Sequence, residues 1–289
     1  MNAHKWIEMS GEILPPESLG HRCAGKLKLA TDNEHVLDKD IVFVEDGHKY
    51  YVRGEVMPLS VTGLIDSVAS DHFDPDAIIE KMKCGRNWPN PQYADMDVTT
   101  GEMVPWTDAS IKQHWAVNGK AAADLGTDLH SKIELYFNDI RFPHIAGQAN
   151  YVEFNYFLQW WNTKKTHFTP FRTEWIIYDT DAKVAGSVDF VMKNTVTGKY
   201  YIVDWKRCKT HDAGFTKSFG KKLLPPLAHL DQTKSQKWAV QVNVYREILE
   251  KNYDIEVEGM CMVVFHTENE QAQVHEFPRL DVRDLLWGA

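Results

Sequence analysis

Cysteine is scarce in this chain of 289 residues, which contains only four. They are scattered, and no two of them form a Cys-x-x-Cys pair. Structural zinc sites and iron–sulfur clusters use several thiolates at such short spacings. We therefore expect no zinc site, no iron–sulfur cluster and reduced thiols at the four positions, Cys23, Cys84, Cys208 and Cys261.

Long apolar runs are also lacking, and no stretch approaches the roughly 20 apolar residues of a membrane-spanning helix. Residues 1–10 have neither the apolar centre of a secretion signal nor the Arg-rich pattern of a transit peptide. These absences predict an intracellular protein without a signal peptide or a membrane partner. The compartment stays open: cytoplasm, the host cell of a phage or virus, or an organelle.

Positive charge is in deficit overall, with 32 Lys and Arg against 41 Asp and Glu and a net charge of −9. This balance argues against a protein that coats nucleic acid through its whole surface. Residues 193–237 differ, because ten Lys or Arg there face three Asp, a local charge of +7. Such a segment suits a phosphate-bearing substrate, although a solvated loop in an acidic protein has the same composition.

The N-terminal part of the chain predicts little regular structure. Residues 1–40 predict a loosely structured N-terminal arm, and residues 41–289 then form a single domain. Residues 41–44 and 49–52 flank an Asp-Gly turn, which predicts a β-hairpin.

An insertion is predicted over residues 71–118, built from helices and loops and not part of a sheet. Three tryptophans are spaced through it, and they are either core anchors or a stacking platform for unpaired bases: Trp88, Trp106 and Trp115.

Residues 121–267 predict an α/β fold in which helices flank a mixed sheet. Three β-rich runs separated by short polar turns predict an antiparallel meander over 174–178, 184–191 and 200–206. Apolar positions at helical spacing predict helices over 121–138, 149–165 and 235–251. Two further strands are predicted over 258–266 and 273–277, and the first would lie parallel to residues 200–206.

Two acids and a lysine interrupt these apolar strands. Asp204 and Lys206 are two residues apart, so their side chains share one face of a strand, and Asp189 on the neighbouring strand can join them. Two carboxylates and a lysine suit metal-dependent cleavage of phosphodiesters. The alternative is a surface ion pair, which the apolar surroundings disfavour.

Two polar pairs lie on the predicted helices. His130 and Glu134 share one face of the first helix, and Gln241 and Tyr245 share one face of the last. Taken singly, the histidine is more often structural than a ligand, and the glutamine is more often a half-buried residue of an amphipathic helix.

The ordered set of these residues resembles the PD-(D/E)XK nucleases, in particular their RecB-like branch. Within that branch it is most similar to the mitochondrial genome maintenance exonucleases and related viral or phage enzymes. The resemblance covers residues 121–267 and implies their αβββαβ core. It rests on Gly126-Thr-Asp-Leu-His130, Gly186-x-x-Asp189, Asp204-x-Lys206 and Gln241-x-x-x-Tyr245.

The resemblance implies a Mg²⁺ or Mn²⁺ site and a set of catalytic residues. The implied metal ligands are His130, Asp189, Asp204 and the backbone carbonyl of Trp205. The implied catalytic residues are His130, Asp189, Asp204 and Lys206, with Lys206 deprotonating or positioning the attacking water. The substrate side would include Glu174, Ser187, Arg207, Lys209, Gln241 and Tyr245.

The implied substrate is DNA, in replication, repair or recombination. In the most similar group the insertion arches over the site and a single strand threads beneath it, so an exonuclease acting on single-stranded ends is expected. The alternatives are a duplex-end exonuclease of the lambda-exonuclease type, a structure-specific endonuclease, or a catalytically silent nucleic-acid-binding protein on the same fold.

Overall fold

The computed structural model describes residues 27–71, 73–209 and 215–288. The chain divides into two compact units, a larger one of Met1–Ser70 and Gly126–Ala289 and a smaller one of Asp71–Leu125. Helix α4 (Asp108–Phe137) contributes its first part to the smaller unit and its last part to the larger one. Among the described residues, no helix combines the length and apolar character needed to cross a membrane.

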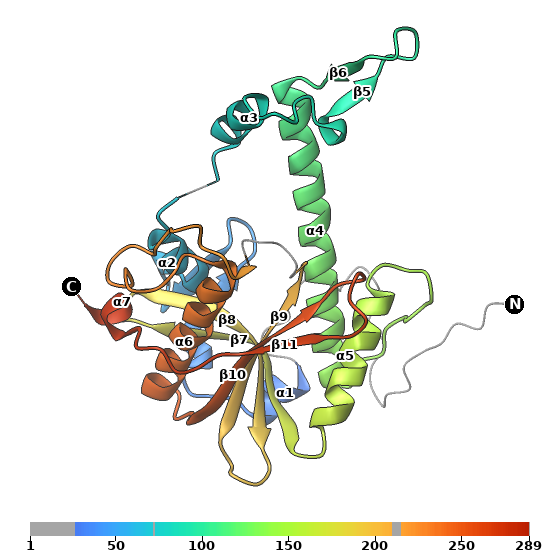
Figure 1. The fold of residues 1–289 in the computed structure, drawn as a ribbon. Coiled ribbons are helices and arrows are strands. Elements are labelled where there is room, and N and C mark those ends of the chain that lie inside the picture. Colours follow the sequence, from blue (N-terminus) through green and yellow to red (C-terminus); the bar gives the residue numbers. More distant parts are fainter. Residues whose placement is uncertain (1–26, 72, 210–214, 289) are drawn as a thin grey trace, which may run out of the picture. The chain divides into compact units, whose positions relative to one another are not determined.

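The larger unit is built on a mixed six-stranded sheet, so the predicted α/β class is confirmed (Figure 1). Its first three long strands form the predicted antiparallel meander, and β10 lies parallel to β9, also as predicted. The strand order is β11-β10-β9-β8-β4, and β7 pairs with the other edge of β8. The strands are β4 (Leu59–Ser60), β7 (Phe168–Asp179), β8 (Val184–Asn194), β9 (Tyr200–Arg207), β10 (Val257–Phe265) and β11 (Gln273–Glu276).

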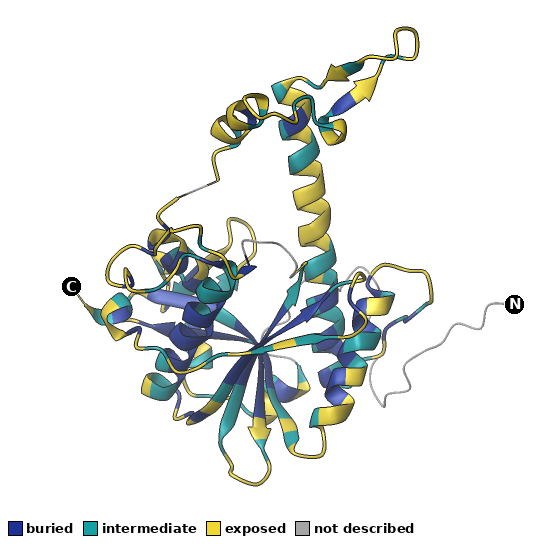
Figure 2. Cartoon of the chain, viewed as in Figure 1, coloured by how far each residue is buried: buried dark blue, intermediate teal, exposed yellow. Residues whose placement is uncertain are grey.

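Helices cover both faces of this sheet, and the strands between them are buried (Figure 2). The last part of α4 and helix α5 (Tyr151–Lys164) form one core with one face. Helices α2 (Val61–Ser67), α6 (Lys234–Asn252) and α7 (Arg283–Trp287) form a second core with the other face. Alternate strand residues feed the two cores: Ile202 of β9 belongs to the second and Val203 to the first.

A three-stranded sheet packs on β7 and β8 through a third, small core. It consists of β1 (Ile41–Val44), β2 (Lys49–Val52) and β3 (Glu55–Val56), and its first two strands are the predicted hairpin.

The loose structure predicted for residues 1–40 is wrong for residues 27–40, while residues 1–26 lie outside the described part. Helix α1 (Lys28–Asp32) buries Leu29, and a 3₁₀ turn, η2 (Asp38–Asp40), follows. The Asp38 carboxylate accepts hydrogen bonds from Arg172 Nη1 at 2.6 Å and Trp175 Nε1 at 2.9 Å. These long-range contacts, which composition does not reveal, hold the segment against β7.

The smaller unit departs from the predicted insertion in two ways. It contains a two-stranded hairpin, β5 (Ala94–Met96) and β6 (Met103–Pro105), where only helices and loops were predicted. Helix α4 also begins at Asp108, well before residue 121. The remaining elements are α3 (Pro75–Lys83) and the 3₁₀ turn η3 (Pro91–Tyr93).

The three tryptophans of this unit are half-buried. Trp115 Nε1 donates to Tyr93 Oη at 3.0 Å, and Trp106 meets Tyr93 and His114 edge to face. Trp106 and Trp115 therefore pack within the smaller unit, and all three tryptophans keep part of their surface exposed.

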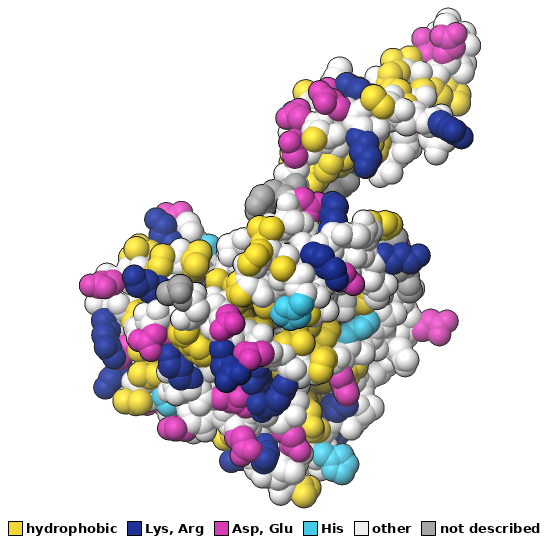
Figure 3. Space-filling model, turned by 60° about the vertical axis from the view of Figure 1, so that its left-hand side comes forward, with side chains coloured by type: hydrophobic (Ala, Val, Ile, Leu, Met, Phe, Trp, Pro, Cys, Tyr) yellow, Lys and Arg dark blue, Asp and Glu magenta, His cyan; other side chains and the backbone are white. Residues whose placement is uncertain are grey.

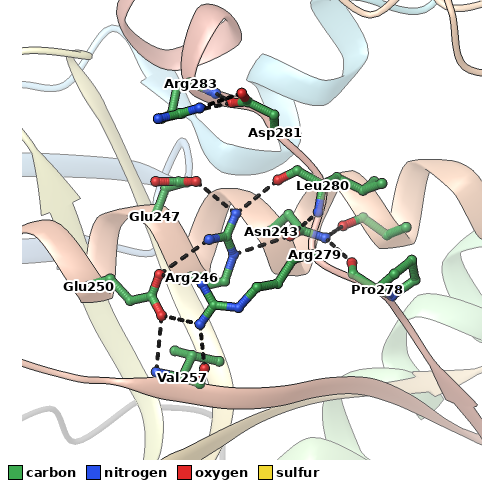
Figure 4. A network of polar contacts seen from close by, with 11 residues as sticks. Asn243, Arg246, Glu247, Glu250, Val257, Pro278, Arg279, Leu280, Asp281 and Arg283 are labelled. Carbon is green, nitrogen blue, oxygen red and sulfur yellow. Dashed lines mark hydrogen bonds and ion pairs between the residues drawn. The ribbon is translucent and has the colours of Figure 1, made fainter.

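The C-terminal segment is connected to α6 by a polar network centred on Arg246, a residue of which only 5% is exposed (Figure 4). Its guanidinium donates to Glu247, Glu250, Asn243 and the carbonyl of Leu280. Four of its five N–H donors are used within the protein, so this network has a structural role.

Cys84, Cys208 and Cys261 are free cysteines, and Cys23 lies outside the described residues.

Candidate metal centre

One edge of β8 pairs with β9 in one part and with β4 in another. The candidate site lies at the residues between these two parts, 186–189, which we call the fork. On this edge Phe190–Lys193 pair with β9, whereas Val184 and Ala185 pair with β4. Pairing on that edge is interrupted between the two, at Gly186, Ser187, Val188 and Asp189. Interrupted sheets leave side chains and backbone groups free to face a ligand, as at the switch points of α/β proteins.

Gly186 allows two helices to approach the fork. A Cβ atom at this position would lie 2.8 Å from Val61 Cγ2 of α2 and 2.9 Å from Tyr245 Cε1 of α6. Carbon atoms pack best at about 3.5–4.0 Å. The glycine of the Gly186-x-x-Asp189 motif is therefore required by close packing, not by an unusual backbone angle.

Three donor groups converge beside the fork. His130 Nδ1 of α4 lies 3.3 Å from Glu174 Oε1 and 3.6 Å from Asp189 Oδ1. One ligand atom from each of the three residues lies within 4.8 Å of the other two. An imidazole with two carboxylates suits Mn²⁺ and related divalent ions, and the carboxylates also suit Mg²⁺.

Glu174 reaches this cluster through an irregular backbone. The register of β7 with β8 sets Glu174 opposite Asp189, since Thr173 pairs with Phe190 and Trp175 with Val188. Glu174 has φ +44°, in the left-handed region that non-glycine residues rarely adopt. Its carboxylate also accepts a hydrogen bond from Ser187 Oγ at 3.1 Å, so two side chains hold it.

The backbone of Trp205 joins two of these residues. Its N–H donates to Asp189 Oδ2 at 2.8 Å, and its carbonyl lies 3.2 Å from His130 Nε2. If Nε2 carries the proton and donates to the carbonyl, the lone pair of Nδ1 faces Glu174 and Asp189. This tautomer is the one a metal-ligating histidine needs.

The predicted pair Asp204 and Lys206 is confirmed as a pair on one strand face. Lys206 Nζ forms an ion pair with Asp204 Oδ2, and Gln241 Nε2 donates to Asp204 Oδ1 at 3.0 Å. Gln241 Nε2 also lies 3.4 Å from Tyr245 Oη. Gln241 therefore orients Asp204, a contact that spacing alone did not reveal.

The charges of the site raise several pKa values. Burial and the nearby Asp204 raise the pKa of Asp189 to about 7, against a smaller opposing effect of His130. Burial lowers the pKa of His130, but Asp189 and Glu174 outweigh it and raise that pKa to about 9. Burial likewise lowers the pKa of Lys206, but Asp204 and Asp189 outweigh this effect, so the pKa lies above its ordinary value. Asp189 and His130 thus bind protons more tightly than usual, and a divalent cation bound at these residues would displace them.

The two predicted basic residues after Lys206 are engaged elsewhere. Arg207 Nη2 lies 2.6 Å from Glu153 Oε1, and Lys209 Nζ lies 2.5 Å from Glu268 Oε1. Other cations of segment 193–237 are paired too, such as Lys199 with Glu256. On the face shown in Figure 3, Lys and Arg lie intermixed with Asp and Glu. The local charge of +7 is therefore partly neutralised by acids from outside the segment.

The structure thus brings most of the predicted site residues together and leaves two apart. These residues form two contact sets that meet at the adjacent residues Asp204 and Trp205. One set is His130, Glu174, Ser187, Asp189 and Trp205, and the other is Asp204, Lys206, Gln241 and Tyr245. Arg207 and Lys209 point to other acids, so their substrate role stays a prediction. Glu174, predicted on the substrate side, lies instead among the donor groups, and its place inside an apolar strand was the available signal.

No protein-family model and no curated protein matches the chain. Among solved structures that match is one titled "Crystal structure of SSO0001", with 14% sequence identity and a TM-score of 0.26. The match covers 61% of this chain and 66% of that chain. A similarity of this size carries no argument about fold or function.

Proposed function

We propose that this chain is a metal-dependent nuclease of the PD-(D/E)XK type that hydrolyses phosphodiester bonds in DNA. The observation that carries the proposal is the convergence of His130, Glu174 and Asp189 beside the Asp204–Lys206 pair. A structural ion pair would not need three further ionisable groups gathered at the same break in a sheet.

The donor set fits a divalent ion, with His130, Glu174 and Asp189 as its holders and Asp204 beside them. The raised pKa values of Asp189 and His130 support this, because crowded anionic groups gain most from a cation. A bound Mg²⁺ or Mn²⁺ would stabilise negative charge on the phosphate and lower the pKa of a water molecule.

The residues of the chain have separate tasks in this proposal. Lys206 has a raised pKa and stays an ammonium at neutral pH, so it orients the attacking water or a phosphate oxygen by donating hydrogen bonds. Its side chain is 28% exposed, which leaves it within reach of a substrate. Gln241 fixes the carboxylate of Asp204, and Tyr245 supports Gln241.

The preference for single-stranded ends rests on the family resemblance and on the ring surface of Trp88, Trp106 and Trp115. Each half-buried ring can stack one base, worth about 1–3 kcal/mol where it makes contact.

Digestion of three labelled substrates tests the proposal: linear single strands, blunt duplexes and single-stranded circles, each with Mg²⁺, Mn²⁺ or EDTA. We expect linear single strands to be degraded with metal only, Asp204→Asn to be inactive, and the exposed control Asp281→Asn to act as wild type. Cutting of circles would indicate an endonuclease, and preference for duplex ends an enzyme of the lambda-exonuclease type. Binding without cleavage under all conditions would refute the nuclease.

A further inference from the structure

The strand end that carries Lys206 is held by a neighbouring strand on one side only. β10 pairs with β9 as far as Arg207, opposite Phe265. On the other side the ladder with β8 ends at Val203, opposite Phe190. The position of Lys206 therefore depends on side-chain contacts made by the last residues of β9.

Arg207 makes two of these contacts. Its side chain points to the face opposite Lys206, where Nη2 lies 2.6 Å from Glu153 Oε1 and Nε donates to Asn150 Oδ1 at 2.9 Å. Only 1% of Glu153 is exposed. Burying an ion pair costs desolvation free energy and seldom adds net stability, so a role in fixing geometry explains its presence better.

Asn150 carries this contact on to the helix of His130. Its Nδ2 donates to Asp128 Oδ2 at 2.7 Å, and Asp128 lies two residues before His130 on α4. Lys132 Nζ donates to the same Asp128 oxygen at 2.7 Å and to the carbonyl of Ala149 at 3.0 Å. One amide side chain thus connects the end of β9 to α4.

The backbone conformation of Asn150 indicates that its side chain, and not helix capping, explains an asparagine at this position. Its φ of +58° lies in the left-handed region, where asparagine is tolerated and glycine is most comfortable. The side chain makes no hydrogen bond that caps α5, although Asn150 is the N-cap residue. Instead, its Oδ1 accepts a hydrogen bond from Arg207 and its Nδ2 donates one to Asp128.

We propose that Arg207, Glu153, Asn150 and Asp128, here called the clamp, are positioning residues that hold Lys206 and His130 in fixed relation. The inference rests on the proposed function for its catalytic consequence, and it replaces the predicted substrate contact of Arg207. The clamp joins β9, which carries Lys206, to α4, which carries His130. Loosening it moves both without removing either.

Two variants test the clamp with different risks to folding. Arg207→Met removes the guanidinium and its hydrogen-bond donors but leaves Glu153 buried and unpaired. Asn150→Gly removes both hydrogen bonds while suiting the backbone angle, so it should fold even if the first does not. The matched control is Arg246→Met, another buried arginine paired with glutamates, in the network of Figure 4.

The readouts are kcat and KM on a labelled single strand, and Mn²⁺ affinity from the free-ion electron paramagnetic resonance signal. We expect clamp variants to lose about 10-fold in kcat and in Mn²⁺ affinity, the size typical of supporting residues at metal sites, with KM for DNA unchanged. Arg246→Met should lower the melting temperature without moving either readout.

A rise in KM with unchanged kcat and Mn²⁺ affinity would return Arg207 to substrate binding and overturn the clamp. Clamp variants equal to Arg246→Met on both readouts would overturn it too. If wild type binds Mn²⁺ but cleaves no DNA, and Asn150→Gly binds Mn²⁺ more weakly than wild type, the proposed function fails while the clamp stands. If wild type binds no Mn²⁺ and cleaves nothing, both fail.

Discussion

The replacement Gly186→Ala should cost stability, because the new methyl group has no room. Its carbon would lie 2.8 Å from Val61 Cγ2, 3.1 Å from Val61 Cβ and 2.9 Å from Tyr245 Cε1. Only 1% of Val61 and 3% of Tyr245 is exposed, and Val61 starts helix α2 under the Ser60 cap. Neither neighbour can rotate into solvent, so backbone must shift.

Overpacking of this kind costs about 1–3 kcal/mol of unfolding free energy. The matched control is Gly119→Ala, in helix α4 with nothing within 4 Å of the added methyl group, which should stabilise by up to about 1 kcal/mol. Urea unfolding of both variants measures the two changes. Equal stability of Gly186→Ala and wild type would refute the close-packing explanation of the glycine.

Three further predictions follow. His130→Ala should weaken Mn²⁺ binding by about 10-fold or more and regain cleavage at high Mn²⁺, whereas a collapse of the melting temperature would make His130 a core residue. In EDTA, the free energy of unfolding should fall as pH rises from 5 to 9, because the folded-state pKa values of Asp189, about 7, and His130, about 9, exceed their ordinary values. Thermal melts of Asp189→Asn should show a smaller fall over this pH range. A fall equal to that of wild type would contradict the assignment of the pH dependence to Asp189. Trp106→Ala should weaken binding of linear single strands by about 1–3 kcal/mol in a fluorescence titration, and lost stability with unchanged affinity would make Trp106 purely structural.

The sequence predicted the sheet and its flanking helices well because each element has its own local pattern. Strands β7 to β9 alternate or run apolar between short turns, and α6 carries a clear apolar stripe. The start of α4 was missed because residues 116–124 are exposed all round, so no packed face imposes a periodicity on them. The hairpin β5–β6 was missed because its strands are only three residues each.

In the candidate site too, the local relations between residues could be predicted from the sequence, and the long-range contacts could not. Asp204 and Lys206 could be predicted to lie together because two residues on one strand face are a local relation. The approach of Glu174 to His130 depends on a left-handed backbone angle in β7 and on an interruption of pairing in β8. The partner of Arg207 lies 54 positions earlier in the chain, on α5. Such relations arise only from tertiary packing.

The most direct test of the central claim separates metal binding from chemistry at one site. Mn²⁺ binding and cleavage of a labelled single strand would be measured together for wild type, Asp189→Asn and Lys206→Ala. We predict that Asp189→Asn loses both, and that Lys206→Ala stays folded and keeps most of its Mn²⁺ affinity but cleaves nothing. Cleavage by a folded Lys206→Ala at the wild-type rate would contradict the account.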